Sequence, residues 1–451
     1  MSLQNTKEGW LIKQGAIVKS WKRRYFVLKG TILEYYEKPG KKQCGTINLN
    51  NASSVATSAE CKKPYLFKIV IPGSRTYFIA AESEQEKTDW IVALQSAISK
   101  AVSRTKGPTE PIEHKISRDD FDILRIIGRG SYGKVQLVRC RVDKKLYAMK
   151  SISKRLLEER EKIPQSITER NVLFSTVHPF LVGAHWSFQT EEKIYLILDY
   201  IPGGELFNRL KEEHSFPEDR VCLYAAELLL AIGHLHSLNI IYRDIKPENI
   251  LVDASGHLKL TDFGQVKTNM TSMDTTTTFC GTAEYIAPEI LQQIPYNKSV
   301  DWWSYGVLVY EMLTGFPPFY DDNVNKMYRM IINDDVTFPS EMSPEAIDFI
   351  TKLLTKDPEQ RLGSSELDYQ EIQKHSFFAS LDWDMVLRRQ YQPKWVPVIK
   401  GETDTSNFDN EFTQDEGEDE REDPTLIDDQ TQKDFVGFTC SADSEITNFK
   451  Q

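Results

Sequence analysis

The stretch YRDIKPEN occupies residues 242–249, and DFG follows at residues 262–264. These residues decide the fold because their chemical types fit one reaction. Asp244 can accept the proton of a hydroxyl group, and Lys246 can neutralise charge on a transferring phosphoryl group. Asn249 and Asp262 offer the oxygen atoms that Mg²⁺ prefers in proteins. Together the two stretches predict a site for phosphoryl transfer.

A glycine-rich string, GRGSYGKV, lies upstream of these motifs. Gly128, Gly130 and Gly133 have no Cβ, so backbone N–H groups can approach phosphate oxygens there. Val135 is expected to cover an adenine, and Lys150 on the next strand to bind the α- and β-phosphates of ATP. The string alone is weak evidence, because dinucleotide-binding folds use a similar one before a helix. Here a strand pattern follows it, which favours a nucleoside triphosphate.

Glu169 lies between these motifs and is the expected helical partner of Lys150. The alternative is a lysine on the protein surface, which the order of the motifs disfavours. The glycine string, lysine, glutamate, YRDIKPEN and DFG follow one another as in protein kinases, which the chain therefore resembles. The resemblance implies that Asp301 anchors the catalytic loop and that Glu289 pairs with Arg361.

The composition sets the broad class of protein. A chain of 451 residues exceeds the size of a single core, and 40% hydrophobic residues can build two or more cores. No apolar run approaches the ~20 residues of a membrane span, and the N-terminus has no signal-peptide pattern. Six scattered cysteines fit reduced thiols in the cytosol. The net charge of −11 argues against general nucleic-acid binding.

The sequence pattern divides the chain into four parts. Residues 1–100 predict a small β-barrel followed by a C-terminal helix. Residues 101–120 predict a linker. Residues 121–378 change from strands to helices and predict an α+β fold of two lobes around a cleft. Residues 379–451 predict an irregular tail, with a run of acidic side chains at 415–423.

Further motifs narrow the resemblance. They are Tyr242 before Arg243, TFCGT at 278–282, NFD at 407–409, FVGFT at 435–439, the basic runs at 7–13 and 21–28, and Trp90. The motifs from Tyr242 onward are similar to those of the AGC serine/threonine kinases, and the N-terminal ones to a pleckstrin-homology domain. Such a domain, an AGC kinase domain and a hydrophobic tail motif together resemble the protein kinase B family. This resemblance implies a kinase that uses ATP and Mg²⁺ and phosphorylates serine or threonine.

In pleckstrin-homology domains, basic residues on the first two strands hold inositol phosphates. The resemblance assigns this role to Lys13, Lys22 and Arg24, with Arg23 between the last two. A cationic pocket suits phosphate groups. The alternative is a solvated basic strand without a ligand. The assignment implies a cytoplasmic protein that phosphoinositides recruit reversibly to the inner face of the plasma membrane.

The resemblance also implies activation by an upstream kinase. Thr278 matches the activation-loop phosphorylation site, and Arg243 and Lys267 are expected to hold its phosphate. The family usually supplies a histidine from the neighbouring helix, and here that position is Gln165. Contact between this phosphate and the helix is therefore an open question.

The tail is expected to dock on the kinase domain. Phe435 and Phe438 would enter an apolar pocket beside the helix that carries Glu169, with Thr439 as the phosphorylation site. Cys440 stands where the family has another aromatic residue. Phe408 is expected to contact the adenine pocket.

A second tail phosphorylation site of the family has no clear counterpart in this chain. The acidic run, with Glu418, Asp419 and Glu420, is one hypothesis for a permanent substitute, and phosphorylation of Thr425 is the rival. Three glutamates match positions that receive arginine side chains of substrates. They predict a preference for basic residues before the phosphorylated serine or threonine, and are Glu205, Glu248 and Glu311.

Three other interpretations compete with this one. A pseudokinase scaffold predicts a missing catalytic residue, and none is missing. A lipid-binding adaptor leaves the phosphotransfer motifs without a purpose. A different class of AGC kinase with a non-selective lipid-binding domain remains the serious rival.

Overall fold

The computed structural model describes residues 6–14, 20–30, 32–49, 54–57, 63–71, 75–83, 86–87, 90–91, 93–94, 116–130, 132–271, 274–414 and 427–442. They belong to two compact units, Met1–His114 and Lys115–Gln451, and each unit has its own core. The predicted linker is described only from residue 116 onward. The acidic run at 415–423 and Thr425 lie outside the described residues.

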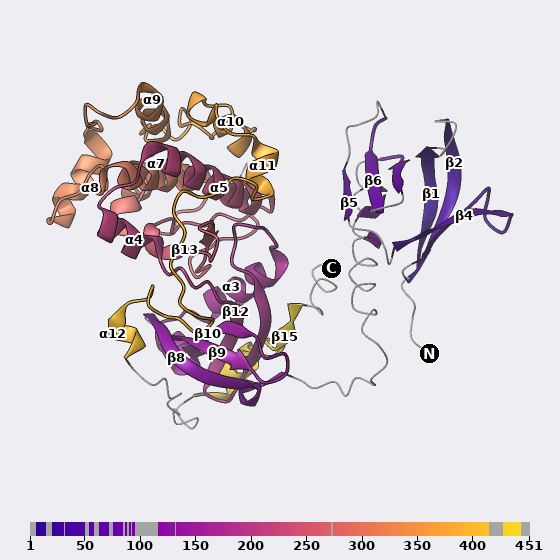
Figure 1. The fold of residues 1–451 in the computed structure, drawn as a ribbon, viewed down its shortest axis with the longest axis horizontal. Helices are drawn as coiled ribbons and strands as arrows, with labels where there is room; N and C mark the ends of the chain where they lie inside the picture. The colour runs from indigo at the N-terminus through magenta and orange to yellow at the C-terminus, as the bar shows by residue number, and fades with distance from the viewer. Residues whose placement is uncertain are drawn as a thin grey trace. The chain divides into compact units, whose positions relative to one another are not determined.

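The N-terminal unit is built on one antiparallel sheet (Figure 1). Its strand order is β4-β3-β2-β1-β7-β6-β5, so β1 lies in the middle beside β7. The strands are β1 Thr6–Gln14, β2 Trp21–Lys29, β3 Ile32–Tyr36, β4 Gln43–Asn48, β5 Ser54–Thr57, β6 Leu66–Ile71 and β7 Arg75–Ala80.

Side chains that alternate along these strands form the core of this unit. Leu11 on β1, Ile47 on β4 and Ile69 on β6 are fully buried in one cluster. Trp90, from a helical stretch after β7, packs edge-on against Phe26 with ring centroids 6.4 Å apart. Strands from both ends of the sheet thus share one core, so the sheet curves around it, as the predicted barrel requires.

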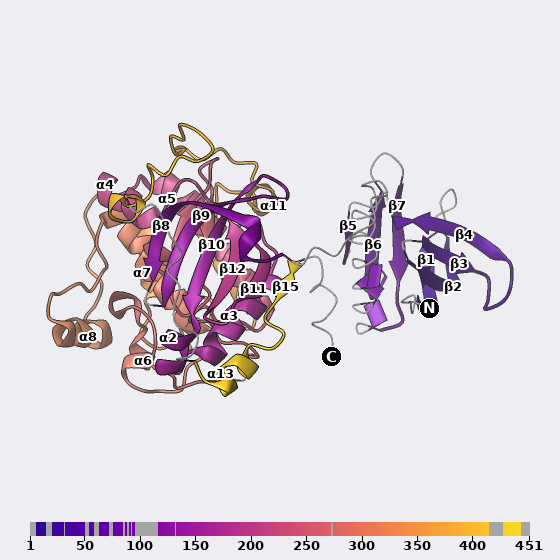
Figure 2. The same ribbon diagram turned by 90° about the horizontal axis from the view of Figure 1, so that it is seen from below.

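The second unit begins with five consecutive antiparallel strands, to which the tail adds a sixth. The order is β15-β11-β12-β10-β9-β8, and Figure 2 shows β15 beside β11. The tail strand pairs Ser441 with Trp186 and Cys440 with Ser187. The strands are β8 Phe121–Gly130, β9 Gly133–Cys140, β10 Leu146–Ser153, β11 Ala184–Gln189, β12 Lys193–Asp199 and β15 Cys440–Ser441.

Four helices belong to this sheet lobe. Two of them directly follow β10, and α3 buries Val172, Leu173 and Phe174 in the core. The other two come from the tail: α12 contacts β8, and α13 lies near α2 (Figure 2). The helices are α2 Lys154–Glu159, α3 Ile163–Ser175, α12 Asn410–Thr413 and α13 Asp429–Asp434.

The helical lobe is organised around α5 and α7, in which most side chains are buried (Figure 1). Arg361 is 1% exposed and donates two hydrogen bonds, of 2.7 and 2.9 Å, to Glu289. The structure therefore forms the ion pair that the sequence predicts. The α-helices are α4 Leu206–Glu213, α5 Glu218–Ser237, α6 Pro288–Leu291, α7 Ser299–Thr314, α8 Val324–Asn333, α9 Pro344–Leu353, α10 Tyr369–Ile372 and α11 Trp383–Leu387.

Short elements complete the helical lobe. A two-stranded hairpin, β13 Ile250–Val252 and β14 Leu258–Leu260, separates the YRDIKPEN and DFG stretches. The 3₁₀ turns of this lobe are η3 Pro247–Asn249, η4 Ala283–Tyr285 and η5 Ser376–Phe378, whereas η2 Arg118–Asp120 directly precedes β8 in the sheet lobe. The predicted sequence of a β-rich domain followed by a two-lobed α+β fold is confirmed. Among the described residues, no helix combines the length and apolar character needed to cross a membrane.

Candidate active site

A buried carboxylate fixes the backbone of the catalytic loop. Asp301 on α7 is fully buried and accepts hydrogen bonds from the backbone N–H groups of Tyr242 (2.8 Å) and Arg243 (2.7 Å). Arg243 has a φ of +69°, a conformation that L-residues rarely adopt. The Asp301 bonds stabilise this turn, which projects Asp244 toward the cleft. The sequence anticipates this anchor, although not its histidine partner.

That partner is His236 on α5. Its Nε2 lies 2.9 Å from Asp301 and its Nδ1 lies 3.1 Å from Asp368. Burial lowers the pKa of His236, but the hydrogen bonds to the two carboxylates outweigh burial and raise the pKa to about 9. The imidazolium therefore stays charged at neutral pH and pairs with the Asp301 side chain beneath the loop.

Asp244 lies in a network of three polar side chains. The Asn249 amide nitrogen donates to its carboxylate (2.8 Å), and Lys246 Nζ lies 3.2 Å from the same oxygen. The Thr282 hydroxyl donates to the other oxygen at 3.0 Å and accepts from Lys246 at 2.9 Å. The predicted proton acceptor is thus held beside the predicted lysine and asparagine.

Lys150 lies at the centre of a second group. Its ammonium contacts Glu169 on α3 at 2.6 Å and Asp262 of the DFG stretch at 3.2 Å. Burial lowers the pKa of Lys150, but the two carboxylates outweigh burial and raise it. The charge of Lys150 lowers the pKa of Asp262 and outweighs burial, which raises it. Burial raises the pKa of Glu169, and the charge of Lys150 opposes this effect only in part. The structure therefore brings the side chains of Lys150, Glu169 and Asp262 together.

The glycine string forms the turn between β8 and β9. A Cβ on Gly133 would lie 1.8 Å from the backbone oxygen of Ser151, so no side chain fits there. Val135 pairs with Gly128 on β8 and with Lys150 on β10. The three glycines and Val135 therefore lie on β8 and β9, beside the strand β10 that carries Lys150.

Phe408 reaches the connection between the lobes from the tail. Its ring stacks on Tyr200, which follows β12, with centroids 6.0 Å apart and planes 17° apart. The Tyr200 hydroxyl donates to the backbone oxygen of Asp404 at 2.7 Å. The tail thus lies against the connection where an adenine is expected.

The donor set fits a hard divalent cation. Because the Asn249 amide nitrogen is bound to Asp244, its carbonyl oxygen is left to act as a ligand. The Asn249 backbone oxygen accepts a 2.9 Å hydrogen bond from the N–H of Thr261, the residue before Asp262. Among the described residues, no three His, Cys, Asp or Glu side chains form a metal site by themselves. A cation held by Asn249 and Asp262 must therefore take further oxygens from phosphate groups and water, which is usual for Mg²⁺.

The three predicted specificity residues form an acidic cluster. Burial first, and then repulsion from Glu248, raises the pKa of both Glu205 and Glu311 to about 7. Asp409 adds repulsion on Glu205, and Tyr285 donates a hydrogen bond to Glu311. In the described part of the chain, Glu248 Oε2 is buried and has no hydrogen-bond partner. The charge of Lys246 lowers the pKa of Glu205 but does not offset burial and repulsion.

The activation loop leaves Thr278 accessible. Thr278 is exposed, whereas Thr276 is buried and accepts a 2.5 Å hydrogen bond from Lys267. The two threonine hydroxyls lie 3.3 Å apart. Tyr296 donates to the Thr278 backbone oxygen at 2.7 Å and accepts from Arg243 at 3.3 Å. Thr278, the predicted phosphorylation site, is therefore linked to Lys267 through Thr276 and to Arg243 through Tyr296.

The tail motif docks on the sheet lobe. Phe435 and Phe438 are 1% and 4% exposed and belong to the core of the second unit. Ser187 and Gln189 on β11 donate hydrogen bonds of 2.6 Å to the backbone oxygens of Phe438 and Phe435. Thr439, between Phe438 and β15, is half-buried.

A buried lysine holds the helix that precedes this motif. Lys154 is fully buried, and its ammonium donates to Gln189 (2.7 Å), Thr190 (2.7 Å) and Gln432 of α13 (2.8 Å). The Gln432 amide nitrogen donates to the backbone oxygen of Glu191 at 2.6 Å. Burial lowers the pKa of Lys154 to about 8. The sequence interpretation did not include Lys154 or Gln432.

The basic residues of the N-terminal unit divide between two faces of the sheet. Lys13 pairs with Lys22 across β1 and β2, so both side chains and that of Arg24 share the inner face. Lys13 is 7% exposed and lies over the rings of Tyr35 and Tyr77.

Arg23 lies on the other face of this sheet. It forms a 2.6 Å ion pair with Glu82 and stacks over Trp10 at 4.7 Å. The structure therefore brings together Lys13, Lys22 and Arg24 but not Arg23. The sequence could have predicted this, because side chains alternate along a strand and Arg23 lies between Lys22 and Arg24.

Thr282 is a polar contact of the catalytic carboxylate that the sequence interpretation did not assign. It is 38 residues from Asp244 in the chain, and only the fold brings the two together. The motif around it was recognised, but its hydroxyl had no assigned partner.

Fold and site together define a protein kinase with an N-terminal domain built on an antiparallel sheet. The chain matches the protein kinase domain family over residues 121–378, the PH domain family over residues 5–99 and the protein kinase C terminal domain family over residues 399–440. A protein kinase domain implies the use of ATP and a divalent metal ion.

Similar proteins narrow the class. The chain is 44% identical over 440 residues to a RAC family serine/threonine-protein kinase homolog of Dictyostelium discoideum, covering 97% of this chain and 98% of that protein. It is 37% identical over 444 residues to the human RAC-beta serine/threonine-protein kinase, covering 90% and 91%. The chain belongs to the RAC (Akt, or protein kinase B) family of serine/threonine protein kinases.

Proposed function

We propose that this kinase is recruited to membranes by phosphoinositides, activated by phosphorylation of Thr278 and Thr439, and directed to serines and threonines that follow arginines. The observation that carries the proposal is the pairing of Lys150 with Asp262 and of Asn249 with Asp244. The Thr261 N–H, next to Asp262, donates to the Asn249 backbone oxygen and so links the two pairs. This arrangement supports phosphoryl transfer. The proposals on substrate choice, activation and lipid binding rest on the acidic cluster, the activation loop, the tail and the N-terminal sheet.

In the proposed mechanism, Lys150 binds the α- and β-phosphates of ATP, and Glu169 fixes its position. The backbone around Gly128, Gly130 and Gly133 approaches the phosphates, while Val135 and Phe408 contact the adenine. Asn249 and Asp262 would hold Mg²⁺, which when bound neutralises charge on the phosphate oxygens. Those residues thereby orient the terminal phosphoryl group.

Asp244 orients the substrate hydroxyl and accepts its proton. Asn249 and Thr282 hydrogen-bond its two carboxylate oxygens, so the side chain has one defined orientation. Lys246, 3.2 Å from Asp244, would stabilise charge on the transferring phosphoryl group.

The acidic cluster supports recognition of arginine. Glu205, Glu248 and Glu311 repel one another, and a guanidinium would relieve this repulsion and supply bidentate hydrogen bonds. Two peptides test this, one with arginines before the serine and one with citrulline, which is neutral and similar in shape. We expect KM to rise about tenfold or more with citrulline. Equal KM values would reject the assignment.

Variants of the cluster localise this preference. Glu205→Gln and Glu311→Gln should reduce the discrimination between the two peptides, whereas Glu341→Gln, an exposed residue elsewhere, should not. Loss of discrimination in Glu341→Gln would place the preference outside the cluster.

Phosphate on Thr278 would draw in Lys267 and Arg243. Lys267 now donates a hydrogen bond to Thr276, whose hydroxyl lies 3.3 Å from that of Thr278. A small movement would therefore bring Lys267 to a phosphate on Thr278. Thr277 is the matched control because it is also exposed. After treatment with an upstream kinase, activation should be lost in Thr278→Ala and kept in Thr277→Ala. The reverse pattern would overturn the site assignment.

The tail supports a second step of activation. Docked Phe435 and Phe438 pack in the core that includes α3, the helix of Glu169, and so favour the Lys150–Glu169 pair. We propose that phosphate on Thr439 strengthens this docking. The acidic residues Glu418, Asp419 and Glu420 remain our proposed substitute for the other tail phosphate, and stoichiometric phosphate on Thr425 in cells would refute it.

The inner-face basic residues support phosphoinositide binding. Lys22 is exposed beside Lys13 and Arg24, and together they offer donors for phosphate groups. We propose that this contact carries the cytoplasmic kinase reversibly to the inner face of the plasma membrane.

The two faces of the sheet supply a matched test of lipid binding. Vesicles with and without phosphoinositides are mixed with the full chain, with Lys22→Ala or with Arg23→Ala. We expect sedimentation with phosphoinositide vesicles to fall for Lys22→Ala and to persist for Arg23→Ala. Equal binding to both vesicle types would instead support an AGC kinase with a non-selective lipid-binding domain.

A further inference from the structure

A cavity lies behind the connection between the two lobes of the kinase domain. Its volume is about 570 Å³, within the range of small-molecule sites. Its walls come from the start of β10, from β11, from residues 199–202 after β12, and from the β13–β14 hairpin. The lining residues are Lys145, Leu146, Tyr147, His185, Asp199, Tyr200, Ile201, Pro202, Asp253, Ala254, Ser255 and Lys259.

This cavity is separate from the active site. Tyr147 and Lys150 are three residues apart on β10, so their side chains project from opposite faces of the sheet. Tyr147 lines the cavity, whereas Lys150 faces Glu169 and Asp262. A ligand here would not occupy the nucleotide position.

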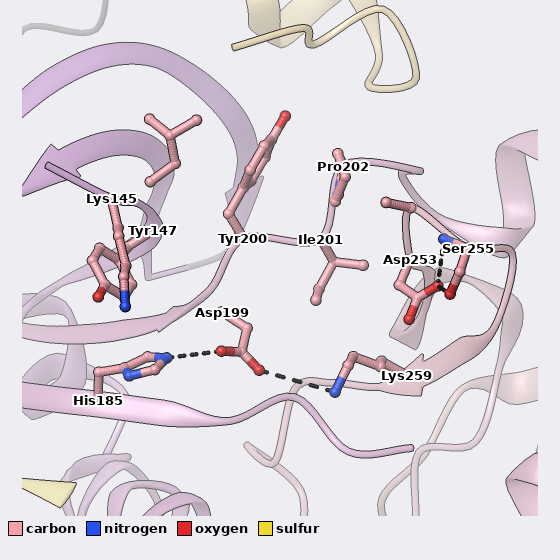
Figure 3. A pocket seen from close by; sticks show the side chains of 12 residues that line it. Lys145, Tyr147, His185, Asp199, Tyr200, Ile201, Pro202, Asp253, Ser255 and Lys259 are labelled. Carbon is pink, nitrogen blue, oxygen red and sulfur yellow. Dashed lines mark hydrogen bonds and ion pairs between the residues drawn. The ribbon is translucent and has the colours of Figure 1, made fainter. Parts of the chain in front are cut away.

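The carboxylates of the cavity are already satisfied. Figure 3 shows His185 and Lys259 converging on Asp199 from opposite sides, at 2.7 and 4.0 Å. Asp199 also accepts a bond from the Gly183 backbone at 3.0 Å. Asp253 accepts from Ser255 and is paired with Arg389. The acceptors are therefore used within the protein.

The donors of the cavity are in excess. Lys259 Nζ donates one hydrogen bond, to Leu181, out of the three that an ammonium can make. The Lys145 ammonium has no hydrogen-bond acceptor within the described residues, and this side chain is exposed at the rim. Arg389 is already paired with Asp253, so the cations of the cavity with unused hydrogen-bonding capacity are Lys145 and Lys259. The hydrogen-bonding capacity that remains unused in the cavity belongs to donors, so an anion would complement it.

The rest of the wall is apolar. Leu146, Ile201, Pro202 and Ala254 contribute aliphatic surface to the lining. We propose that this cavity is a binding site for a small organic carboxylate with a flat apolar body. Lys145 and Lys259 bind its carboxylate, and the aliphatic residues cover its body.

Such a ligand would act on the angle between the lobes. Lys145 and Tyr147 belong to the sheet lobe, whereas Ala254 and Lys259 belong to the hairpin of the helical lobe. A ligand that contacts both walls binds one lobe arrangement better than others and so shifts the population. ATP also bridges the lobes, so the two ligands must influence each other's affinity equally.

The test uses 2-naphthoate as the probe and 2-naphthamide as its neutral control. Binding to the full chain is measured with the nucleotide site saturated by a non-hydrolysable ATP analogue and Mg²⁺. The variants are Lys145→Ala, which removes one cation, and Ala254→Phe, which fills the cavity from an exposed position. Lys374→Ala is the matched control, since it removes an exposed lysine far outside the lining.

We expect wild type and Lys374→Ala to bind 2-naphthoate equally. Lys145→Ala should weaken binding about fivefold or more, as loss of a charge-assisted hydrogen bond does. Ala254→Phe should abolish binding and keep the melting temperature. The probe should also change the KM for ATP in wild type but not in Ala254→Phe.

Three results would overturn the proposal. Equal binding of the carboxylate and the amide would refute the choice of an anion. Binding that Ala254→Phe leaves intact would place the probe elsewhere. Binding without any change in the KM for ATP would remove the link to the lobe angle.

Discussion

Glu205 and Glu311 have pKa values of about 7, raised first by burial and then by Glu248. In the proposed recognition, substrate arginine binds their ionised forms, so protonation competes with it. We therefore predict that KM for an arginine-containing peptide falls as pH rises from about 6 to about 8. Initial rates over this range, fitted separately for kcat and KM, measure the effect.

The citrulline peptide is the control for this pH profile. It cannot pair with the carboxylates, so its KM should change little over the same range. A parallel pH dependence for both peptides would assign the effect to another titrating group.

His236 couples pH to stability. Its folded-state pKa of about 9 lies above the ordinary value of 6.5. Its contribution is therefore complete below about pH 6.5 and is lost as pH rises through about 9. We predict that the melting temperature of wild type falls over this range more steeply than that of His236→Gln. Equal slopes would show that the imidazolium does not stabilise Asp301.

At the residue scale, the sequence predicted contacts that a motif defines by spacing. Lys150–Glu169 and Glu289–Arg361 are both present. Thr282 was not assigned, because its contact with Asp244 depends on how the activation segment folds back. Arg23 was grouped with Lys22 by adjacency, although strand alternation turns neighbouring side chains to opposite faces.

At the scale of single elements, the β8–β9 turn tolerates a side chain at Gly128 better than at Gly133. A Cβ on Gly133 would overlap backbone, whereas a Cβ on Gly128 would lie 3.7 Å from Val135, an ordinary contact. We predict that Gly133→Ala lowers the melting temperature and that Gly128→Ala has little effect on it. Thermal unfolding of the two variants measures this, and equal shifts would contradict the geometry.

The tail helix α13 offers a second matched pair. Gln432→Ala removes one of three hydrogen-bond acceptors from buried Lys154 and the bond to the Glu191 backbone. Weaker docking, by about 1–3 kcal/mol, should speed hydrogen exchange in α13 and α3. Gln430 is exposed on α13, and its side chain donates a hydrogen bond to Asp434, so Gln430→Ala should not speed this exchange. Identical exchange in both variants would remove Lys154 from tail docking.

Elements were predicted where periodicity is strong, and missed where the tail acquires structure by docking. The barrel strands and the helical lobe have clear alternating or helical patterns. The short α12, α13 and β15 have few residues each, and their stability comes from contacts with β8, Lys154 and β11. Sequence pattern alone therefore left most of the tail irregular.

At the scale of the whole molecule, the two units carry separate tasks. The N-terminal sheet presents basic side chains, and the second unit contains the complete phosphotransfer set. The sequence predicted this division because each family has its own motifs. The cavity behind the lobes was not predicted, since its lining residues come from five separated segments that only the fold brings together.

The central claim is that Asp244, Lys150, Asn249 and Asp262 form one site for phosphoryl transfer. The most direct measurement is the initial rate of γ-phosphate transfer from ATP to an arginine-containing peptide in Mg²⁺, for wild type, Asp244→Asn and the surface control Lys374→Ala. We predict that kcat falls about 100-fold or more in Asp244→Asn, with an unchanged melting temperature, and stays at the wild-type value in Lys374→Ala. A folded Asp244→Asn variant with the wild-type rate would contradict the account.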